Sequence, residues 1–121
     1  MKMKILMADD DTITLKMLEK CLLRYGFALA QASNGKDAVF LAKDWRPDLI
    51  ILDIMMPDMD GSDAAEKLRN HPATKNIPVI FLSSLVAKNE EDGKRVMNGY
   101  TYLAKPFDER TLLAEIHRHL D

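Results

Sequence analysis

The chain alternates between short apolar runs and longer segments in which apolar residues recur at helical spacing. The apolar runs are Lys4–Ala8, Phe27–Ala32, Leu49–Leu52, Val79–Leu82 and Tyr100–Ala104. Unbroken apolar runs of this length are typical of parallel strands that are covered on both faces. Each run is followed by a segment that we interpret as a helix, so the pattern predicts five strands alternating with five helices.

This alternation predicts an α/β fold class, a doubly wound (βα)5 three-layer sandwich. Gly26 and Pro47 are signals that end the first two predicted helices. Apolar residues recur at helical spacing in the four clearest helical segments: Leu15, Leu18, Leu22 and Tyr25; Ala38, Leu41, Ala42 and Trp45; Ala65 and Leu68; and Leu112, Ile116 and Leu120. Right-handed crossovers and a parallel five-stranded sheet follow, and we expect the flavodoxin-like strand order 2-1-3-4-5.

The segment from Lys88 to Gly99 gives the weakest helical signal. It has no apolar residue between Ala87 and Val96, and Gly93 lowers helix propensity by ~1 kcal/mol relative to alanine. We expect a fourth helix here that is held mainly by its ends. Low local stability suits an element that shifts, so the fourth helix, fifth strand and fifth helix are the expected output face. A solvated charged face without a signalling role is the alternative.

Composition narrows the class of protein. The 121 residues are 47% hydrophobic and 30% charged, a globular balance that favours one domain over residues 1–121. Seventeen basic against nineteen acidic residues give a net charge of −2, which argues against a nucleic-acid binder. The lone Cys21 favours a reducing compartment. With no apolar run long enough for a signal peptide or a membrane span, we expect a cytoplasmic protein that does not bind membranes.

Polar side chains follow four of the five predicted strands. Asp9 and Asp10 follow the first strand, Asp53 the third, Ser83 the fourth and Lys105 the fifth. Ligands of open parallel sheets bind beyond the carboxyl ends of the strands. We therefore expect these side chains to converge on one rim.

The converging carboxylates point to a divalent cation. At ~4 Å and an effective dielectric constant of ~20, each pair of like charges costs on the order of 4 kcal/mol. Mg²⁺ removes this cost and prefers carboxylates, a carbonyl and retained water. Asp9, Asp10 and Asp53 match that chemistry, and the main-chain carbonyl of Met55 is a further candidate ligand.

Asp53 lies at the centre of the predicted rim and is the candidate nucleophile. A carboxylate can accept a phosphoryl group as a mixed anhydride. Lys105 would supply a positive point charge. Ser83 could donate a hydrogen bond to the phosphoryl group only after transfer, a contact that differs between the two states and can therefore bias a conformational equilibrium.

The chain resembles the receiver domain of bacterial two-component response regulators of the chemotaxis type, over essentially its whole length. The motifs that carry the resemblance lie in residues 5–11, 47–61, 78–84 and 102–107. The resemblance implies that Asp53 is the phosphoacceptor, that Asp9 and Asp10 hold Mg²⁺, that Ser83 is the switch hydroxyl and that Lys105 binds phosphate. It also implies that Tyr102 changes rotamer on activation and that the Lys105–Pro106 peptide bond is cis.

The resemblance also implies the partners. Members of this family take their phosphoryl group from a histidine kinase or a histidine phosphotransfer protein and lose it spontaneously. The chain is then a signalling switch, which catalyses only its own phosphorylation and dephosphorylation, rather than an enzyme with a separate substrate. A downstream effector protein or effector domain would read the signal, and a homodimer formed on phosphorylation is a further candidate.

Three positions depart from the family pattern or vary within it. Ser84 follows the switch hydroxyl where the family usually has alanine or glycine, and its larger side chain could narrow the path to the phosphoryl group. Met55 and Leu85 occupy the variable positions two residues beyond the phosphoacceptor and the switch hydroxyl. Neither can position a water molecule, so we expect slow autodephosphorylation.

Two other functions fit parts of the sequence. A metal-dependent phosphatase of the haloacid dehalogenase type would use a nucleophile within Asp9 to Asp11 and would not need Asp53, but it usually requires more chain. A flavin-binding electron carrier would place its phosphate loop after the first strand, where three acids would repel the ligand. Both alternatives are weaker than the receiver domain.

Overall fold

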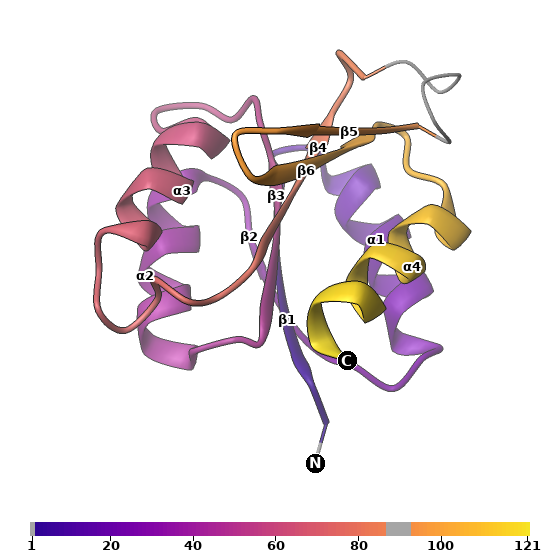
Figure 1. The fold of residues 1–121 in the computed structure, drawn as a ribbon, viewed down its shortest axis with the longest axis horizontal. Helices are drawn as coiled ribbons and strands as arrows, with labels where there is room; N and C mark the ends of the chain where they lie inside the picture. Colours follow the sequence, from indigo (N-terminus) through magenta and orange to yellow (C-terminus); the bar gives the residue numbers. More distant parts are fainter. Residues whose placement is uncertain (1, 87–92) are drawn as a thin grey trace.

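A central sheet separates two pairs of helices in the computed structural model, which describes residues 2–86 and 93–121 (Figure 1). The strands are β1 (Lys4–Ala8), β2 (Ala28–Ala32), β3 (Leu49–Asp53), β4 (Val79–Ser83), β5 (Lys94–Met97) and β6 (Tyr100–Ala104). The helices are α1 (Thr12–Leu23), α2 (Gly35–Trp45), α3 (Gly61–Arg69) and α4 (Glu109–Leu120). Within the described residues, no helix is long and apolar enough to cross a membrane.

The sheet confirms the predicted doubly wound topology. Its strand order is β2-β1-β3-β4-β6-β5, and the first five strands of this order are parallel. They correspond to the predicted order 2-1-3-4-5, with the predicted fifth strand now labelled β6. The carboxyl ends of β1, β3, β4 and β6 therefore meet at one rim.

The predicted fourth helix is wrong over residues 93–99, and residues 88–92 lie outside the described part of the chain. Instead, β5 pairs antiparallel with β6 at the sheet edge. Asn98 and Gly99 connect the two strands with φ of 52° and 81°, the positive values that a tight type I′ hairpin turn requires. The Asn-Gly dipeptide favours this turn, and β-branched Val96 favours a strand.

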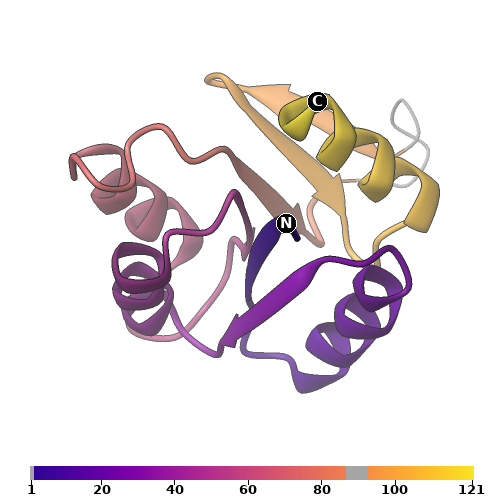
Figure 2. The same cartoon turned by 90° about the horizontal axis from the view of Figure 1, so that it is seen from below.

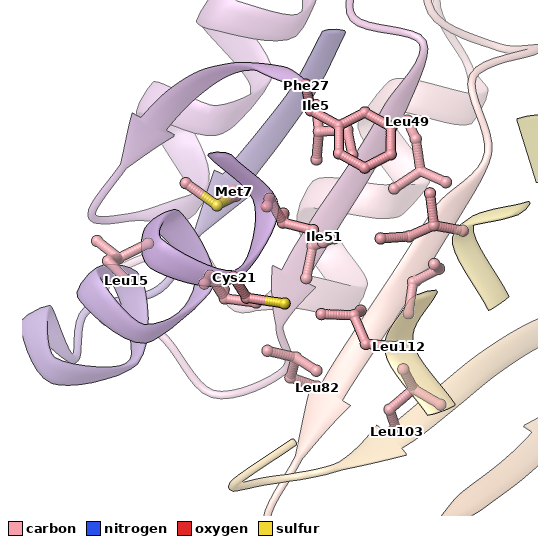
Figure 3. Packing of buried hydrophobic residues seen from close by; sticks show 14 residues of the cluster. Ile5, Met7, Leu15, Cys21, Phe27, Leu49, Ile51, Leu82, Leu103 and Leu112 are labelled. Atoms are coloured by element: carbon pink, nitrogen blue, oxygen red, sulfur yellow. The ribbon is translucent and has the colours of Figure 1, made fainter. Parts of the chain in front are cut away.

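Each face of the sheet packs against one helix pair. Alternate strand residues such as Ile5, Met7 and Ile51 point towards α1 and α4 and form one buried cluster, part of which Figure 3 shows. The intervening residues, including Leu6 and Ile50, form a second cluster with α2 and α3. Figure 2 shows the two helical layers on opposite sides of the strands. Apolar burial on both faces explains why the strand sequences are nearly continuous apolar runs.

Polar side chains cap all four described helices. Asp11, Asn34, Asp60 and Asp108 each occupy the N-cap position and accept a hydrogen bond from a backbone N–H of the first turn. Such caps satisfy amide groups that have no partner within the helix. Because Asp11 caps α1, the two acids before it are not needed for this purpose.

Candidate phosphoryl-transfer site

Three acids gather at the carboxyl ends of β1 and β3. Asp9 and Asp10 follow the last residue of β1, and Asp53 is the last residue of β3. One carboxylate oxygen of each lies within 4.8 Å of the others. The predicted convergence of these three side chains is therefore present in the structure.

Burial distinguishes the three acids. Asp9 is 0% exposed and Asp53 is 4% exposed, whereas Asp10 lies on the surface. Asp10 and Asp53 both line an open pocket of about 430 Å³, together with Met55 and Lys105. Because the pocket reaches Asp53 but not Asp9, the geometry favours Asp53 over Asp9 as the group that meets an incoming reagent.

Lys105 reaches into the acidic cluster from the end of β6. Its Nζ lies 2.9 Å from Oδ2 of Asp9 and 3.6 Å from Oδ1 of Asp53, and it also donates a hydrogen bond of 3.1 Å to Oδ1 of Asp9. Burial alone would lower the pKa of Lys105, but the hydrogen bond and the two negative charges outweigh it and raise the pKa above its ordinary value. The ammonium group therefore stays charged. The Lys105–Pro106 bond is cis, as the resemblance implied.

The environment of Asp53 raises its pKa to about 6. Burial is the largest cause, and the neighbouring charge of Asp9 adds to it. The positive charge of Lys105 and the backbone N–H of Met55 act in the opposite direction without cancelling the effect. A carboxylate perturbed by both burial and a like charge, beside an open pocket, is typical of a functional site.

The donor set fits a magnesium ion. Oδ1 of Asp9 accepts a hydrogen bond of 2.8 Å from the backbone N–H of Asp11. The buried Oδ2 lies 2.9 Å from Nζ of Lys105 but accepts no well-oriented hydrogen bond from the described residues. Three carboxylates also outnumber the ammonium of Lys105. Oxygen ligands with excess negative charge are what Mg²⁺ prefers, so Asp9, Asp10 and Asp53 could hold one. The main-chain carbonyl of Met55 as a further ligand stays a prediction.

Neither Ser83 nor Tyr102 contacts Asp53 in any described interaction. Ser83 is buried at the end of β4, one residue beyond the register partner of Asp53. Its Oγ accepts a hydrogen bond of 3.1 Å from the backbone N–H of Leu85. Tyr102 stacks on Phe81, with ring centroids 4.8 Å apart. The structure thus places Ser83 beside the site and Tyr102 on the neighbouring strand, two residues before the register partner of Ser83, and the switching roles of both stay predictions.

One residue that shapes the site could not be assigned a role from the sequence. Gly61 is the last residue of the motif at 47–61, and it packs directly on the backbone that carries Asp53. A Cβ atom at position 61 would lie 2.4 Å from the carbonyl oxygen of Asp53. The N–H of Gly61 also donates a hydrogen bond of 2.9 Å to the carbonyl of Ile54. Only glycine permits this close approach.

Comparison with known proteins agrees with this arrangement. The chain is 33% identical over 114 residues to protein PilH of Pseudomonas aeruginosa, covering 94% of both chains. It is 37% identical over 117 residues to the probable transcriptional regulator ycf29 of Pyropia yezoensis, but spans only 53% of that protein. A similar solved structure is the receiver domain of sensor histidine kinase PA1611 from P. aeruginosa, which was crystallised with a magnesium ion coordinated in its active-site cleft. The two structures superpose with a TM-score of 0.81 at 28% identity, over 98% of this chain and 97% of that one.

The family model of the response regulator receiver domain matches residues 5–117, which is nearly the whole chain. This match includes all the strand ends at which the acids, the hydroxyl and the ammonium group lie. The chain therefore belongs to the response regulator receiver domain family of two-component signalling.

Proposed function

We propose that the chain is a phosphorylation-controlled switch in which Asp53 accepts a phosphoryl group in a Mg²⁺-dependent reaction. The donor is a phosphohistidine of a histidine kinase or of a histidine phosphotransfer protein. The observation that carries the proposal is the position of Asp53, which lines an open pocket within 4.8 Å of two further carboxylates and 3.6 Å from the ammonium of Lys105.

The transfer step is a substitution at phosphorus. A carboxylate oxygen of Asp53 forms the new O–P bond, the P–N bond of the donor breaks, and the released imidazole takes up a proton from the solvent. Lys105 stabilises negative charge on the phosphoryl oxygens. Mg²⁺, held by Asp9, Asp10 and Asp53, would supply further charge neutralisation. The structure of the PA1611 receiver domain with magnesium in its cleft supports this assignment.

Readout follows from groups that meet the phosphoryl oxygens only after transfer. Ser83 is the proposed hydrogen-bond donor, and its movement would affect the strand that carries Tyr102. The surface formed by β5, β6 and α4 is then the proposed output face for an effector protein or effector domain. It replaces the output face expected from the sequence, which included a fourth helix between the fourth and fifth predicted strands. We propose no separate substrate, since the reactions catalysed are the chain's own phosphorylation and dephosphorylation.

Labelling with small phosphodonors tests this function. Acetyl phosphate with Mg²⁺ should add one phosphoryl group to the wild type, seen as a mass increase, and beryllofluoride with Mg²⁺ should bind to it. Asp53→Asn should abolish both effects. Asp44→Asn, which removes an exposed carboxylate on α2, is the matched control and should leave both intact. Labelling of Asp53→Asn at the wild-type level, or turnover of phosphate monoesters, would contradict the proposal.

A further inference from the structure

A further buried carboxylate lies away from the acidic cluster. The side chain of Glu115, in the middle of α4, is only 2% exposed. Its Oε1 lies 2.9 Å from Nζ of Lys94 in β5, and its Oε2 accepts a hydrogen bond of 2.8 Å from Oγ1 of Thr101 in β6. One carboxylate thus joins α4 to both strands of the β5–β6 hairpin.

Two residues of the same helix complete the polar network. Arg118 donates to Oε2 of Glu115 through Nη2 at 2.5 Å and Nε at 3.1 Å, and Nε2 of His119 lies 3.0 Å from the same oxygen. Burial alone would raise the pKa of Glu115, but the hydrogen bonds from Arg118, Lys94 and Thr101 outweigh it and hold the pKa at about 2. A buried carboxylate needs such partners, because an unpaired one is costly.

The hairpin connects this network to the residues of the phosphoryl-transfer site. The N–H of Ala104 donates a hydrogen bond of 2.7 Å to the carbonyl of Gly93. Gly93 directly precedes Lys94, and Ala104 directly precedes Lys105, whose N–H donates to the carbonyl of Ser83 at 3.1 Å. A shift of the hairpin relative to α4 would therefore move the backbone of Lys105 and Ser83.

The contacts of Lys105 and Ser83 describe the state of the site when the hairpin is packed on α4. The ammonium of Lys105 is 2.9 Å from Asp9 but 3.6 Å from Asp53, and the hydroxyl oxygen of Ser83 accepts a bond from the N–H of Leu85. In this arrangement Lys105 pairs more closely with Asp9 than with the proposed phosphoacceptor. To contact a phosphoryl group on Asp53, the ammonium of Lys105 would move closer to Asp53, and the hydroxyl of Ser83 would turn the O–H that it still has to donate towards the phosphoryl oxygens.

We propose that Glu115 acts as an ionic latch that holds the β5–β6 hairpin on α4 and so restrains Lys105 and Ser83 from moving towards a phosphoryl group. This inference rests on the proposed function and adds a means of regulating it. A ligand shifts an equilibrium only by its difference in affinity for the two states. Weakening the latch lowers the stability of the restrained state, so the phosphoryl-bound state becomes easier to reach.

The test compares Glu115→Gln with Glu109→Gln. Glu109 is a matched control because it lies on the same helix, is 40% exposed and pairs with Arg24 rather than with the hairpin. Amide hydrogen exchange of residues 94–104 reports on the latch alone. Titration with beryllofluoride in the presence of Mg²⁺ reports on its coupling to Asp53.

We expect hairpin amides to exchange about tenfold faster in Glu115→Gln. Half-saturation should occur at a beryllofluoride concentration about fivefold lower or more, the usual scale of coupling between two sites. Glu109→Gln should change neither quantity. If Glu115→Gln does not fold, Lys94→Met removes only the contact from β5 and should shift both quantities in the same directions.

The outcomes separate the latch from the proposed function. Hairpin exchange equal to that of the control would overturn the latch. Faster exchange with unchanged or weaker beryllofluoride binding would overturn its coupling to the site. A wild type that does not bind beryllofluoride would contradict the proposed function, while the exchange comparison would still decide whether Glu115 holds the hairpin.

Discussion

Replacing Glu115 with glutamine should destabilise the chain at neutral pH and do so much less in acid. The wild-type carboxylate is ionised, buried and bonded to Lys94, Thr101 and Arg118. Glutamine keeps the size and one acceptor oxygen but removes the charge. Three basic side chains pair with Glu115: Lys94 from β5, and Arg118 and His119 from its own helix, α4.

The pKa of Glu115 sets the magnitude. Folding lowers it from an ordinary 4.5 to about 2, and each unit is worth about 1.4 kcal/mol of difference between the two protonation states. The ionised carboxylate therefore contributes roughly 3 to 4 kcal/mol to the free energy of unfolding at pH 7. This agrees in size with the cost of removing one partner of a buried ion pair, about 3–5 kcal/mol.

The direction of the pH effect follows from the lowered pKa. Because the folded chain holds its proton on Glu115 less tightly than the unfolded chain, the contribution is fully present above pH 4.5. It is lost as the pH falls from 4.5 towards 2. Between pH 7 and pH 3 the difference in stability between wild type and variant should shrink by about 2 kcal/mol.

Urea denaturation of both proteins at several pH values between 7 and 3 measures this difference directly. Effects of the other carboxylates cancel, because they are common to the two proteins. Glu109→Gln, which removes a partly exposed partner of Arg24, should cost no more than about 1 kcal/mol at any of these pH values. A difference for Glu115→Gln that stays constant from pH 7 to pH 3, or grows in acid, would refute the reasoning.

Three further predictions concern the phosphoryl-transfer site. Gly61→Ala should lower the free energy of unfolding by about 1–3 kcal/mol in urea denaturation, since its Cβ would meet the carbonyl oxygen of Asp53 at 2.4 Å; unchanged stability would show that the backbone there can yield. Asp10→Asn should weaken Mg²⁺ binding in a titration by lowering the charge of the ligand set, and an unchanged affinity would remove Asp10 as a direct ligand. Because Met55 and Leu85 are 65% and 74% exposed and cannot position water, the double variant Met55→Asn, Leu85→Glu should lose its phosphoryl group faster; a rate equal to or below the wild-type rate would contradict slow dephosphorylation through these residues.

The parallel part of the fold was predictable because burial on both faces leaves a strong sequence signal. Leu49 to Leu52 and Val79 to Leu82 are continuous apolar runs, and the structure buries every residue of β3 and β4. The strand ends then follow from the topology, which is why the sequence placed Asp9, Asp53 and Lys105 at one rim. Their distances and the raised pKa of Asp53 depend on packing and needed the structure.

The edge of the sheet was predicted wrongly because a weak local signal competed with the expected alternation. The turn signal at Asn98 and Gly99 was present, and an antiparallel hairpin satisfies it without a helix. β5 buries few apolar side chains, since Val96 is 61% exposed, so hydrophobic periodicity could not reveal it. Glu115 was missed for a related reason: it lies between Leu112 and Ile116 in an apolar stripe, and only the tertiary fold brings Lys94 and Thr101 to it.

Two of the buried acids, Asp53 and Glu115, show how the partners of a buried carboxylate decide what it does. Asp53 and Glu115 are both almost inaccessible, yet the pKa of the first is raised to about 6 and that of the second is lowered to about 2. Burial acts on both in the same direction. Glu115 overcomes it with Lys94, Arg118 and a hydroxyl, so its bonding is complete. Asp53 faces a second carboxylate and shares one lysine with it, so its negative charge is under-compensated beside an open pocket. Under-compensated charge favours the arrival of a cation and of a group that can react with the carboxylate, whereas complete compensation favours a fixed contact. The same physical rule therefore favours a reactive carboxylate at Asp53, at the end of β3, and a fixed contact at Glu115, in the middle of α4.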